Sequence, residues 1–413
     1  MDQVNGAAPK AYLRGTHRAV APAETLARFR RYAAPMGITR LADVTGLDYI
    51  GIPVIMACRP NSRALSVAQG KGLDLDAARA SGFMEAAETW HGEHIDLPIP
   101  VASRRTLKRG RRVVDLGIVP RTHGFNATDR TELPWIEAED LFNNEPIWVP
   151  YELIHTDCRE FREHQNSGHF PVCSNGLASG NTRLEAICAG LYEIIERDAN
   201  ALWALLPRVA RAATRLDLDT VDDAYCRVLI DRLTEAKMLL SVWDMTSDVG
   251  VAAFFVRLRE GPGNTRMPLG AFCGAGCHLS RGIALSRAIT EAVQSRLTYI
   301  SGSRDDLKRH NYEEPAHQRI SELANRLWES RIPARRFDEV PDNARGDFDS
   351  DLKFLLERVK AVGAEHVCVV DLTKKEFGIP VVRLMVPGLE LDPEDAPDYA
   401  LGERAQRFQQ SLA

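Results

Sequence analysis

The sequence predicts an α+β fold in which helices pack against mixed β-sheets, and three observations support this. Helical periodicity runs through long segments at 75–90, 183–206 and 279–302. Short apolar runs bounded by Gly and Pro, for example 49–57 and 379–386, are typical of strands. Helices and strands do not alternate in the regular rhythm of a doubly wound sheet, so mixed sheets covered by helices are expected.

In the first part of the chain, a basic stretch to about residue 33 forms an arm that leads into a helix at 22–34. A loop is expected at 66–76, because glycines punctuate it. Segment 103–144 carries charged runs and turn residues, which favour short strands and loops, and its apolar part at 114–120 fits a strand.

In the second part, the polar segment 155–168 is expected to be exposed. Apolar runs predict strands at 239–244, 251–258 and 367–371. The charged stretch 303–349 is expected to be an insertion with its own helix. No short repeat period or low-complexity tract appears.

Composition excludes several classes of protein. The 413 residues include 57 acidic and 52 basic side chains, a net charge of -5, which argues against binding to bulk nucleic acid or to an anionic membrane. No apolar run is long enough to span a bilayer and no secretory signal is visible at the amino terminus. Eight cysteines are then expected to be reduced thiols, in a cytoplasmic protein.

Three predicted helices carry the same short pattern, two oxygen-bearing side chains three residues apart. The pairs are Glu85 with Glu88, Glu193 with Glu196, and Glu291 with Gln294. Residues at this spacing project from one helical face, and the residues between them are apolar, so the acids are expected to be partly buried. Buried anions need cations, and Mg²⁺ takes carboxylates together with phosphate oxygens and water.

Basic residues near these pairs extend the hypothesis. Arg197, Arg287 and Arg296 lie beside or one turn away from the acids, where they would face the phosphates of a nucleotide held by Mg²⁺. The alternative interpretation is that the three patterns are solvated helix faces, which is usual for a single such motif.

A Gly-rich turn at 174–182, SNGLASGNT, precedes the middle helix. Backbone N–H groups at a helix start favour an anion or a ribose hydroxyl, but for this turn taken alone ordinary helix capping is the favoured interpretation. The turn matches neither the P-loop nor the G-x-G-x-x-G pattern, so neither of those nucleotide folds is supported.

With these segments aligned, the chain resembles the YcaO family. The resemblance rests on SVAQGKG from Ser66, SGFMEAAETWH from Ser81, NGLASGNTRLEA from Asn175, LYEIIERDA from Leu191 and ALSRAITEAVQSR from Ala284. It implies a composite α+β domain, often a homodimer, that binds ATP between helices and uses ATP and Mg²⁺ to phosphorylate the oxygen of a peptide amide. The phosphorylation would come after, or together with, attack by a nucleophile on the carbonyl carbon, and the nucleophile takes the place of the oxygen.

The resemblance also implies roles for single residues. The acids at the Mg²⁺ and phosphate site would be Glu85, Glu88, Glu193, Glu196 and Glu291. The other residues that contact the phosphates would be Gln294, Arg197 and Arg287. The residues that contact the rest of the nucleotide would be Asn181, Glu185, Arg18 and Thr25. Glu193, Glu196, Arg197 and Arg287 would form the catalytic set. The parts expected are an arm and first α/β segment at 1–64 that contributes to the nucleotide site, a catalytic domain at 65–390 and a polar tail at 391–413.

Two departures from the family pattern indicate the product. The chain does not end in the proline-rich tail of many azoline-forming members, and Thr89, Trp90 and His91 follow the first acidic pair. With His17 and Arg18, these residues resemble the branch that works beside a TfuA-like partner and forms thioamides. We expect a thioamide in a peptide or protein substrate. The alternatives are an azoline-forming cyclodehydratase, an amidine from an internal amine, and a non-catalytic ATP-binding accessory factor for sulfur transfer.

Other candidate groups are weaker. The spacing of Cys158, His164, His169 and Cys173 fits no regular zinc class, so a solvated loop is expected there. His91 and His94 do not form the H-E-x-x-H pattern and are expected to end a helix. Cys273 and Cys277, which could relay sulfide, are expected to be buried thiols. The basic run at 104–112 is expected to be solvated, and it could also attract an acidic peptide or partner.

Overall fold

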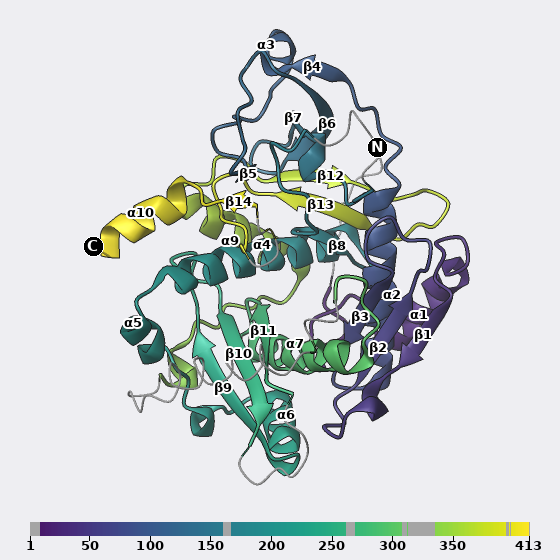
Figure 1. Cartoon of the computed structure of the whole chain (residues 1–413), viewed down its shortest axis with the longest axis vertical. Helices are drawn as coiled ribbons and strands as arrows, with labels where there is room; N and C mark the ends of the chain where they lie inside the picture. Colours follow the sequence, from purple (N-terminus) through teal and green to yellow (C-terminus); the bar gives the residue numbers. More distant parts are fainter. Residues whose placement is uncertain are drawn as a thin grey trace.

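A computed structural model describes residues 9–159, 167–261, 269–307, 312, 335–393, 396 and 398–412. The helices are α1 (Pro22–Phe29), α2 (Leu75–Glu93), α3 (Arg104–Leu107), α4 (Arg183–Leu205), α5 (Arg208–Ala213), α6 (Ala224–Glu235), α7 (Arg281–Ser301), α9 (Phe348–Ala361) and α10 (Glu403–Leu412). Together with four β-sheets in the described residues they give the α+β architecture that the sequence predicts (Figure 1).

The strands form separate antiparallel sheets. One has the order β1 (Arg40–Asp43), β2 (Val54–Cys58), β3 (Val67–Lys71), and a second has the order β11 (Ala271–Cys277), β10 (Ala253–Glu260), β9 (Met238–Asp244). The largest runs β4 (Val101–Ser103), β6 (Glu132–Asp140), β12 (Cys368–Asp371), β13 (Val381–Met385), β8 (Leu177–Ser179), with β7 (Glu145–Pro150) also on β6. A small sheet pairs β5 (Arg121–Thr122) with β14 (Tyr399–Ala400).

The same unit occurs three times in this fold: a strand, a three-residue connection and a long helix. The connections are 72–74 between β3 and α2, 180–182 between β8 and α4, and 278–280 between β11 and α7. The side chains of Asp74 and Thr182 cap the first two helices. The units lie about a hundred residues apart in the chain, which is why a search for short repeats does not find them.

Glycines let two of these helices lie directly against their strands. A Cβ atom on Gly70 of β3 would lie 2.1 Å from the carbonyl oxygen of Ala78 in α2. A Cβ atom on Gly276 of β11 would lie 2.1 Å from the carbonyl oxygen of Ala284 in α7. In both units the contact joins a strand glycine to a helical alanine eight residues later, so the two helices dock in the same way.

Helix α4 lies in the middle of the molecule, between the largest sheet and the β9–β11 sheet (Figure 1). Its residues Ile187, Leu191 and Ile195 are buried in one hydrophobic cluster with Leu384 of β13 and Ala275 of β11. This packing fixes the position of α4 relative to the other two long helices. Within the described residues, no helix is both long and apolar enough to cross a membrane.

Several predicted elements are confirmed. The three long helices correspond to α2, α4 and α7, and the predicted strands at 49–57, 239–244, 251–258, 367–371 and 379–386 correspond to β2, β9, β10, β12 and β13. Much of the predicted insertion at 303–349, namely 308–311 and 313–334, lies outside the described residues.

Other expectations are wrong, and glycine explains most of them. The expected loop at 66–76 contains β3, and strand β11 was not predicted. Both strands contain glycines that allow a helix to pack closely against them, but in a sequence glycines are typical of loops. The expected strand at 114–120 is a turn in which Asp115 accepts a hydrogen bond from the N–H of Gly117. Segment 155–168 is not wholly exposed, since His155 and Thr156 are buried.

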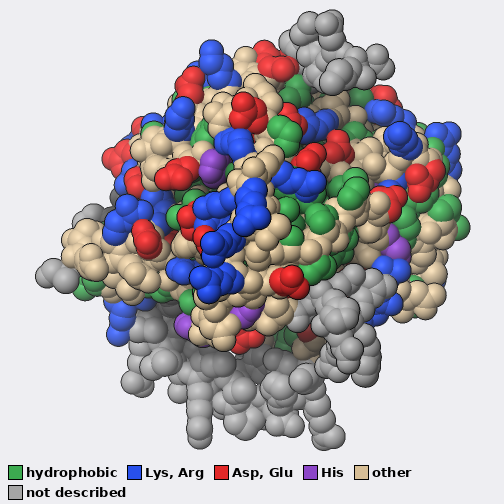
Figure 2. Space-filling model, turned by 90° about the horizontal axis from the view of Figure 1, so that it is seen from above, with side chains coloured by type: hydrophobic (Ala, Val, Ile, Leu, Met, Phe, Trp, Pro, Cys, Tyr) green, Lys and Arg blue, Asp and Glu red, His purple; other side chains and the backbone are tan. Residues whose placement is uncertain are grey.

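Lys and Arg side chains gather on the face seen from above, which carries α3 and β4 (Figure 2). Arg104 is buried and pairs with Asp115 and Asp129. The exposed members of the basic run are Arg105, Lys108, Arg109 and Arg111. This solvated turn agrees with the sequence prediction.

We expect Gly70→Ala to lower the free energy of unfolding by about 1–3 kcal/mol, the usual cost of overpacking. The added Cβ would press on the backbone of α2, and only movement of the helix could relieve it. Gly110→Ala is the control, because an added Cβ there meets no atom within 4 Å. Urea denaturation measures both variants, and equal stabilities would contradict the close contact between β3 and α2.

Candidate active site

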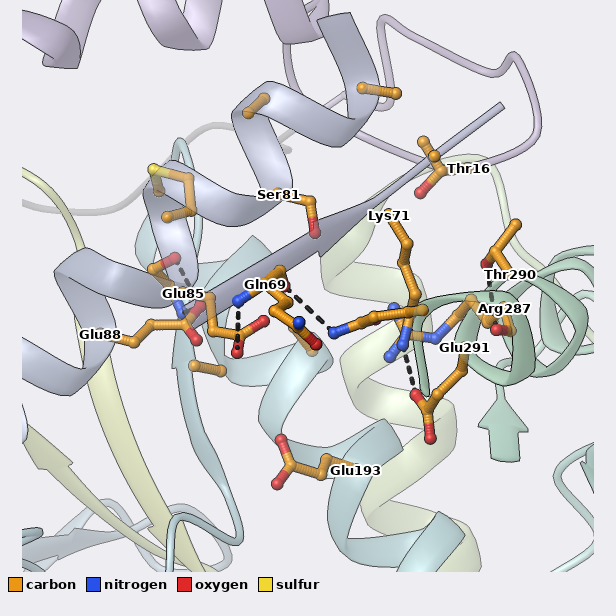
Figure 3. A pocket seen from close by; sticks show the side chains of 18 of the residues that line it. Thr16, Gln69, Lys71, Ser81, Glu85, Glu88, Glu193, Arg287, Thr290 and Glu291 are labelled. Atoms are coloured by element: carbon orange, nitrogen blue, oxygen red, sulfur yellow. Dashed lines mark hydrogen bonds and ion pairs between the residues drawn. The ribbon is translucent and has the colours of Figure 1, made fainter. Parts of the chain in front are cut away.

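A pocket of about 830 Å³ lies among α2, α4 and α7 and the amino-terminal arm. Twelve of the thirteen predicted site residues line it: Arg18, Thr25, Glu85, Glu88, Asn181, Glu185, Glu193, Glu196, Arg197, Arg287, Glu291 and Gln294. Figure 3 shows Glu85 and Glu88, Glu193, and Glu291 around the cavity on three different helices. The prediction that these residues lie together therefore agrees with the structure.

The repeated unit explains why the three pairs meet. Glu85 lies ten residues after the first residue of α2, and Glu193 and Glu291 lie ten residues after the first residues of α4 and α7. Ten residues of helix rise about 15 Å, so each pair lies at the same distance from its strand. The second member of each pair follows three residues later on the same helical face.

The pair on α2 is held by hydrogen bonds from two strands. The backbone N–H of Gln69 on β3 donates to Glu85 Oε1 over 3.3 Å. The backbone N–H and the hydroxyl of Ser179 on β8 donate to Glu88 Oε1 over 2.8 and 2.6 Å. Burial raises the pKa of Glu85 to about 6 and that of Glu88 to about 8, against the opposing effect of these hydrogen bonds.

The pairs on α4 and α7 face a lysine from β3. Lys71 Nζ forms an ion pair with Glu291 Oε2, and the N–H of Ala275 donates to Glu291 Oε1 over 3.2 Å. Burial opposes ionisation of Glu291, but Lys71 and Arg197 together hold its pKa below the ordinary value. Burial and then the charge of Glu291 raise the pKa of Glu196.

At the other end of the pocket, Glu185 joins the arm to the start of α4. Its carboxylate accepts hydrogen bonds from Arg18 Nη1 at 3.3 Å, from the N–H of Ala19 at 3.2 Å and from the N–H of Asn181 at 3.2 Å. Thr25 Oγ1 donates to Asn181 Oδ1 over 3.0 Å. The residues predicted to contact the nucleotide thus form one connected group.

The amino-terminal arm forms one wall of the pocket. Lys10 Nζ makes a buried ion pair with Asp351 on α9, and the backbones of Tyr12 and Arg18 exchange two hydrogen bonds. Tyr12, Thr16 and Arg18 line the pocket. The arm is therefore anchored at one end by α9 and at the other by Glu185 on α4.

Arg296 is the exception among the predicted site residues. It does not line the pocket, and its buried guanidinium pairs with Asp48 at 2.7 Å and Glu260 at 2.5 Å. Five residues beyond Glu291, it lies about 140° around the helix and faces away from the acids. The predicted phosphate contact of Arg296 is therefore wrong, and Arg296 instead joins α7 to the connection between β1 and β2 and to β10.

The residues present fit a nucleotide with Mg²⁺ better than a metal held by protein alone. Among the described residues, no three His, Cys, Asp or Glu side chains lie close enough to form a metal site by themselves. Glu196 Oε2, Gln294 Oε1 and Arg287 Nε are nevertheless buried without a hydrogen-bond partner in the described part of the chain. Since Mg²⁺ usually takes one or two carboxylates and completes its shell with phosphate and water, the oxygens of Glu196 and Gln294 fit the metal, and the N–H of Arg287 fits a phosphate oxygen.

Some pocket residues were not predicted. Lys71, Gln69 and Ser179 lie in the SVAQGKG and NGLASGN segments that carry the family resemblance, but their strands were expected to be loops. The ion pair between Lys71 and Glu291 joins residues 220 positions apart, and no local pattern indicates it.

The weaker candidate groups lie elsewhere. His164 falls outside the described residues, so the group with Cys158, His169 and Cys173 cannot be assessed as a whole. Helix α2 ends at Glu93, between His91 and His94, as predicted. Cys277 is buried, as expected, whereas Cys273 is exposed.

The chain is similar to several known proteins. The family model described as YcaO cyclodehydratase, ATP- and Mg²⁺-binding, matches residues 69–390. A Rhizobium leguminosarum bv. trifolii protein described as "Uncharacterized protein in tfuA 3'region" is 37% identical, over 91% of this chain and 89% of that protein. A protein from Methanothermobacter thermautotrophicus is 36% identical, over 91% of this chain and 97% of its own.

Solved structures show the same fold. YcaO from Methanopyrus kandleri, bound with AMPPCP and Mg²⁺, matches with a TM-score of 0.74 at 23% identity, over 94% of this chain and 97% of that chain. A heterocyclase in complex with substrate and cofactor matches with a TM-score of 0.76 at 22% identity. That match covers 94% of this chain and 54% of the heterocyclase.

We expect Mg²⁺-dependent nucleotide binding to weaken as the pH falls from about 8 to about 6. Glu88 and Glu85 take up protons in this range, and a cation must displace them. The expected loss is up to about tenfold per pH unit for each proton displaced. Calorimetry with a non-hydrolysable ATP analogue, in buffers of different ionisation enthalpy, measures affinity and proton release. An affinity that depends on Mg²⁺ but not on pH would contradict the raised pKa values.

Proposed function

The chain belongs to the YcaO family, whose members bind ATP and Mg²⁺, and we propose that it phosphorylates the oxygen of a peptide backbone amide and lets sulfide replace it. This proposal rests on one observation: the paired side chains of three helices line the same pocket, together with Arg197 and Arg287. An amide oxygen is a poor leaving group, and phosphorylation converts it into a good one.

The residues of the pocket divide this work. Lys71 keeps Glu291 ionised, so a negative oxygen is available at neutral pH. The acids of α2 and α4 face the same cavity. Hydrogen bonds from Gln69 and Ser179 hold the two α2 carboxylates in place. Mg²⁺, when bound with ATP, supplies positive charge to the phosphate oxygens.

Arg197 and Arg287 would stabilise the charge that develops on the transferred phosphoryl group. Both line the pocket, and Arg197 Nη1 lies 3.8 Å from Asp392 Oδ2. Because Asp392 also accepts a hydrogen bond from Asn200 on the next turn of α4, this carboxylate orients the Arg197 side chain on its helix.

Replacement of oxygen by sulfur balances without an oxidant. Amide, ATP and hydrosulfide give thioamide, ADP and phosphate: the C–S bond forms, the C–O bond breaks, and the hydrosulfide proton leaves with the phosphate. Two observations favour sulfur, namely the relative from the tfuA 3′ region and the sequence that follows the first acidic pair, Thr89, Trp90 and His91.

We further propose the setting of this reaction. The chain would act as a homodimer in the cytoplasm, on a peptide or protein substrate and with a TfuA-like partner. The exposed basic turn after α3 would attract an acidic segment of one of these. We also propose that the chain consists of three parts, at 1–64, 65–390 and 391–413, and that the first part contributes to the nucleotide site.

A second candidate function is azoline formation, favoured by the structural match to a heterocyclase. In that reaction a Cys, Ser or Thr side chain of the substrate attacks the amide carbon in place of sulfide. The same pocket would serve both reactions, and the product distinguishes them. A non-catalytic ATP-binding factor for sulfur transfer would release no phosphate on addition of substrate.

We expect Glu193→Gln with Glu196→Gln to reduce ATP consumption by at least about a hundredfold, because amides cannot replace the charge of the carboxylates. The fold should persist, since the substitutions keep the size of the side chains. Phosphate release measures turnover, and thermal unfolding checks folding. Glu235→Gln, an exposed site on α6, is the control. Normal turnover in a folded double variant would refute the role of the α4 acids.

We expect incubation with ATP, Mg²⁺, sulfide, the TfuA-like partner and the natural substrate to increase substrate mass by the difference between sulfur and oxygen. Mass spectrometry measures this directly. Loss of one water would instead identify the azoline reaction, and an unchanged substrate with no phosphate release would favour the accessory role.

A further inference from the structure

A second, much smaller pocket lies between α4, β13 and the turn that precedes β8. It is lined by Cys173, Asn175, Ile194, Arg383 and neighbouring apolar residues. Its volume of about 20 Å³ has room for one small molecule, since a single water needs about 10–15 Å³. Segment 173–177 borders both pockets, since Ser174 and Leu177 line the large pocket, and Cys173 and Asn175 line the small one.

Arg383 on β13 brings a buried, positively charged side chain to this small pocket. Its side chain is 2% exposed. Nε and Nη2 donate to the carbonyl oxygen of Leu153 at 3.1 and 3.0 Å, and Nη2 also donates to that of Cys173 at 2.8 Å. Among the described residues, Nη1 has no hydrogen-bond partner. A buried guanidinium in this position favours an anion.

The one carboxylate that lines the small pocket is already engaged. Glu390 accepts hydrogen bonds from the hydroxyl of Tyr399 at 2.5 Å and from the N–H groups of Gly402 and Ala405, both at 2.8 Å. Within the described residues, Glu390 and Arg383 form no ion pair, so Arg383 Nη1 stays available to a guest.

An acceptor completes the small pocket. Asn175 Oδ1 is buried and, within the described residues, accepts no hydrogen bond. Cys173 Sγ lies 4.0 Å from Arg383 Nη2 and adds a polarizable wall. The pocket thus offers one charged donor and one neutral acceptor, which suits a small monovalent anion that carries a single hydrogen.

We propose that this pocket binds hydrosulfide and holds it beside the site of amide activation, an inference that rests on the proposed thioamide function. The sulfur would accept from Arg383 Nη1, and the S–H group would donate to Asn175 Oδ1. A separate pocket is needed, because the large pocket collects buried acids that repel an anion until Mg²⁺ and nucleotide neutralise them.

The experiment compares the wild type with Arg383→Gln and Asn175→Ala. Arg257→Gln, a buried arginine on β10 outside both pockets, is the control. Binding is measured by calorimetry with sodium hydrosulfide and by the anomalous signal of bromide soaked into crystals. The KM for hydrosulfide is measured in thioamide formation, and ATP affinity and thermal unfolding are checked in every variant.

We expect hydrosulfide and bromide to bind the wild type and the control at Arg383. We expect both pocket variants to lose this binding and to raise the KM for hydrosulfide by at least about tenfold, at unchanged ATP affinity. If Arg383→Gln does not fold, Asn175→Ala alone decides. A bound water only, with no bromide or hydrosulfide, overturns the proposal, and so does an unchanged KM. Hydrosulfide binding without any thioamide product supports this pocket and refutes the proposed function instead.

Discussion

The burial of like-charged carboxylates is the constraint on which this structure depends. Glu85, Glu88, Glu196 and Glu291 face one cavity, and burial opposes the ionisation of every one of them. Lys71 compensates one of these charges directly. The other buried carboxylates still need positive charge close to them, and Mg²⁺ bound with a nucleotide supplies it. ATP and Mg²⁺, the cofactors of the family, therefore suit the residues of this pocket.

The fold meets this constraint by repetition. Each acidic helix follows its strand after three residues and carries its first acid at the same depth, so one arrangement of strand and helix places all three pairs. Close contacts at Gly70 and Gly276 fix two of the helices to their strands without intervening side chains. The third helix, α4, is fixed between two sheets by the buried residues around Leu191. Because the acids lie on rigid helices, their positions relative to one another are fixed more closely than they would be on loops.

Much of the site could be predicted from short patterns, because helical spacing places two acids on one face whatever the rest of the chain does. Glu193 and Glu196 illustrate this. Contacts between distant segments could not be predicted: Lys71 reaches Glu291 from another unit, and Ser179 reaches Glu88 from β8. The same limit explains Arg296, since nearness to Glu291 in the chain does not reveal that Asp48 and Glu260 bind it on the opposite face. Glycine-rich strands were predicted to be loops for a related reason: the segments that they contact lie elsewhere in the chain.

The buried ion pair between Lys10 and Asp351 has a consequence for biosynthesis. A ribosome makes the arm first, yet the residue that anchors it emerges only when most of the polypeptide has been translated. Until then the arm lacks its anchor on α9, and Glu185 on α4 holds it at the other end. This wall of the pocket is therefore completed late in synthesis, by a contact between the arm and a helix far along the chain.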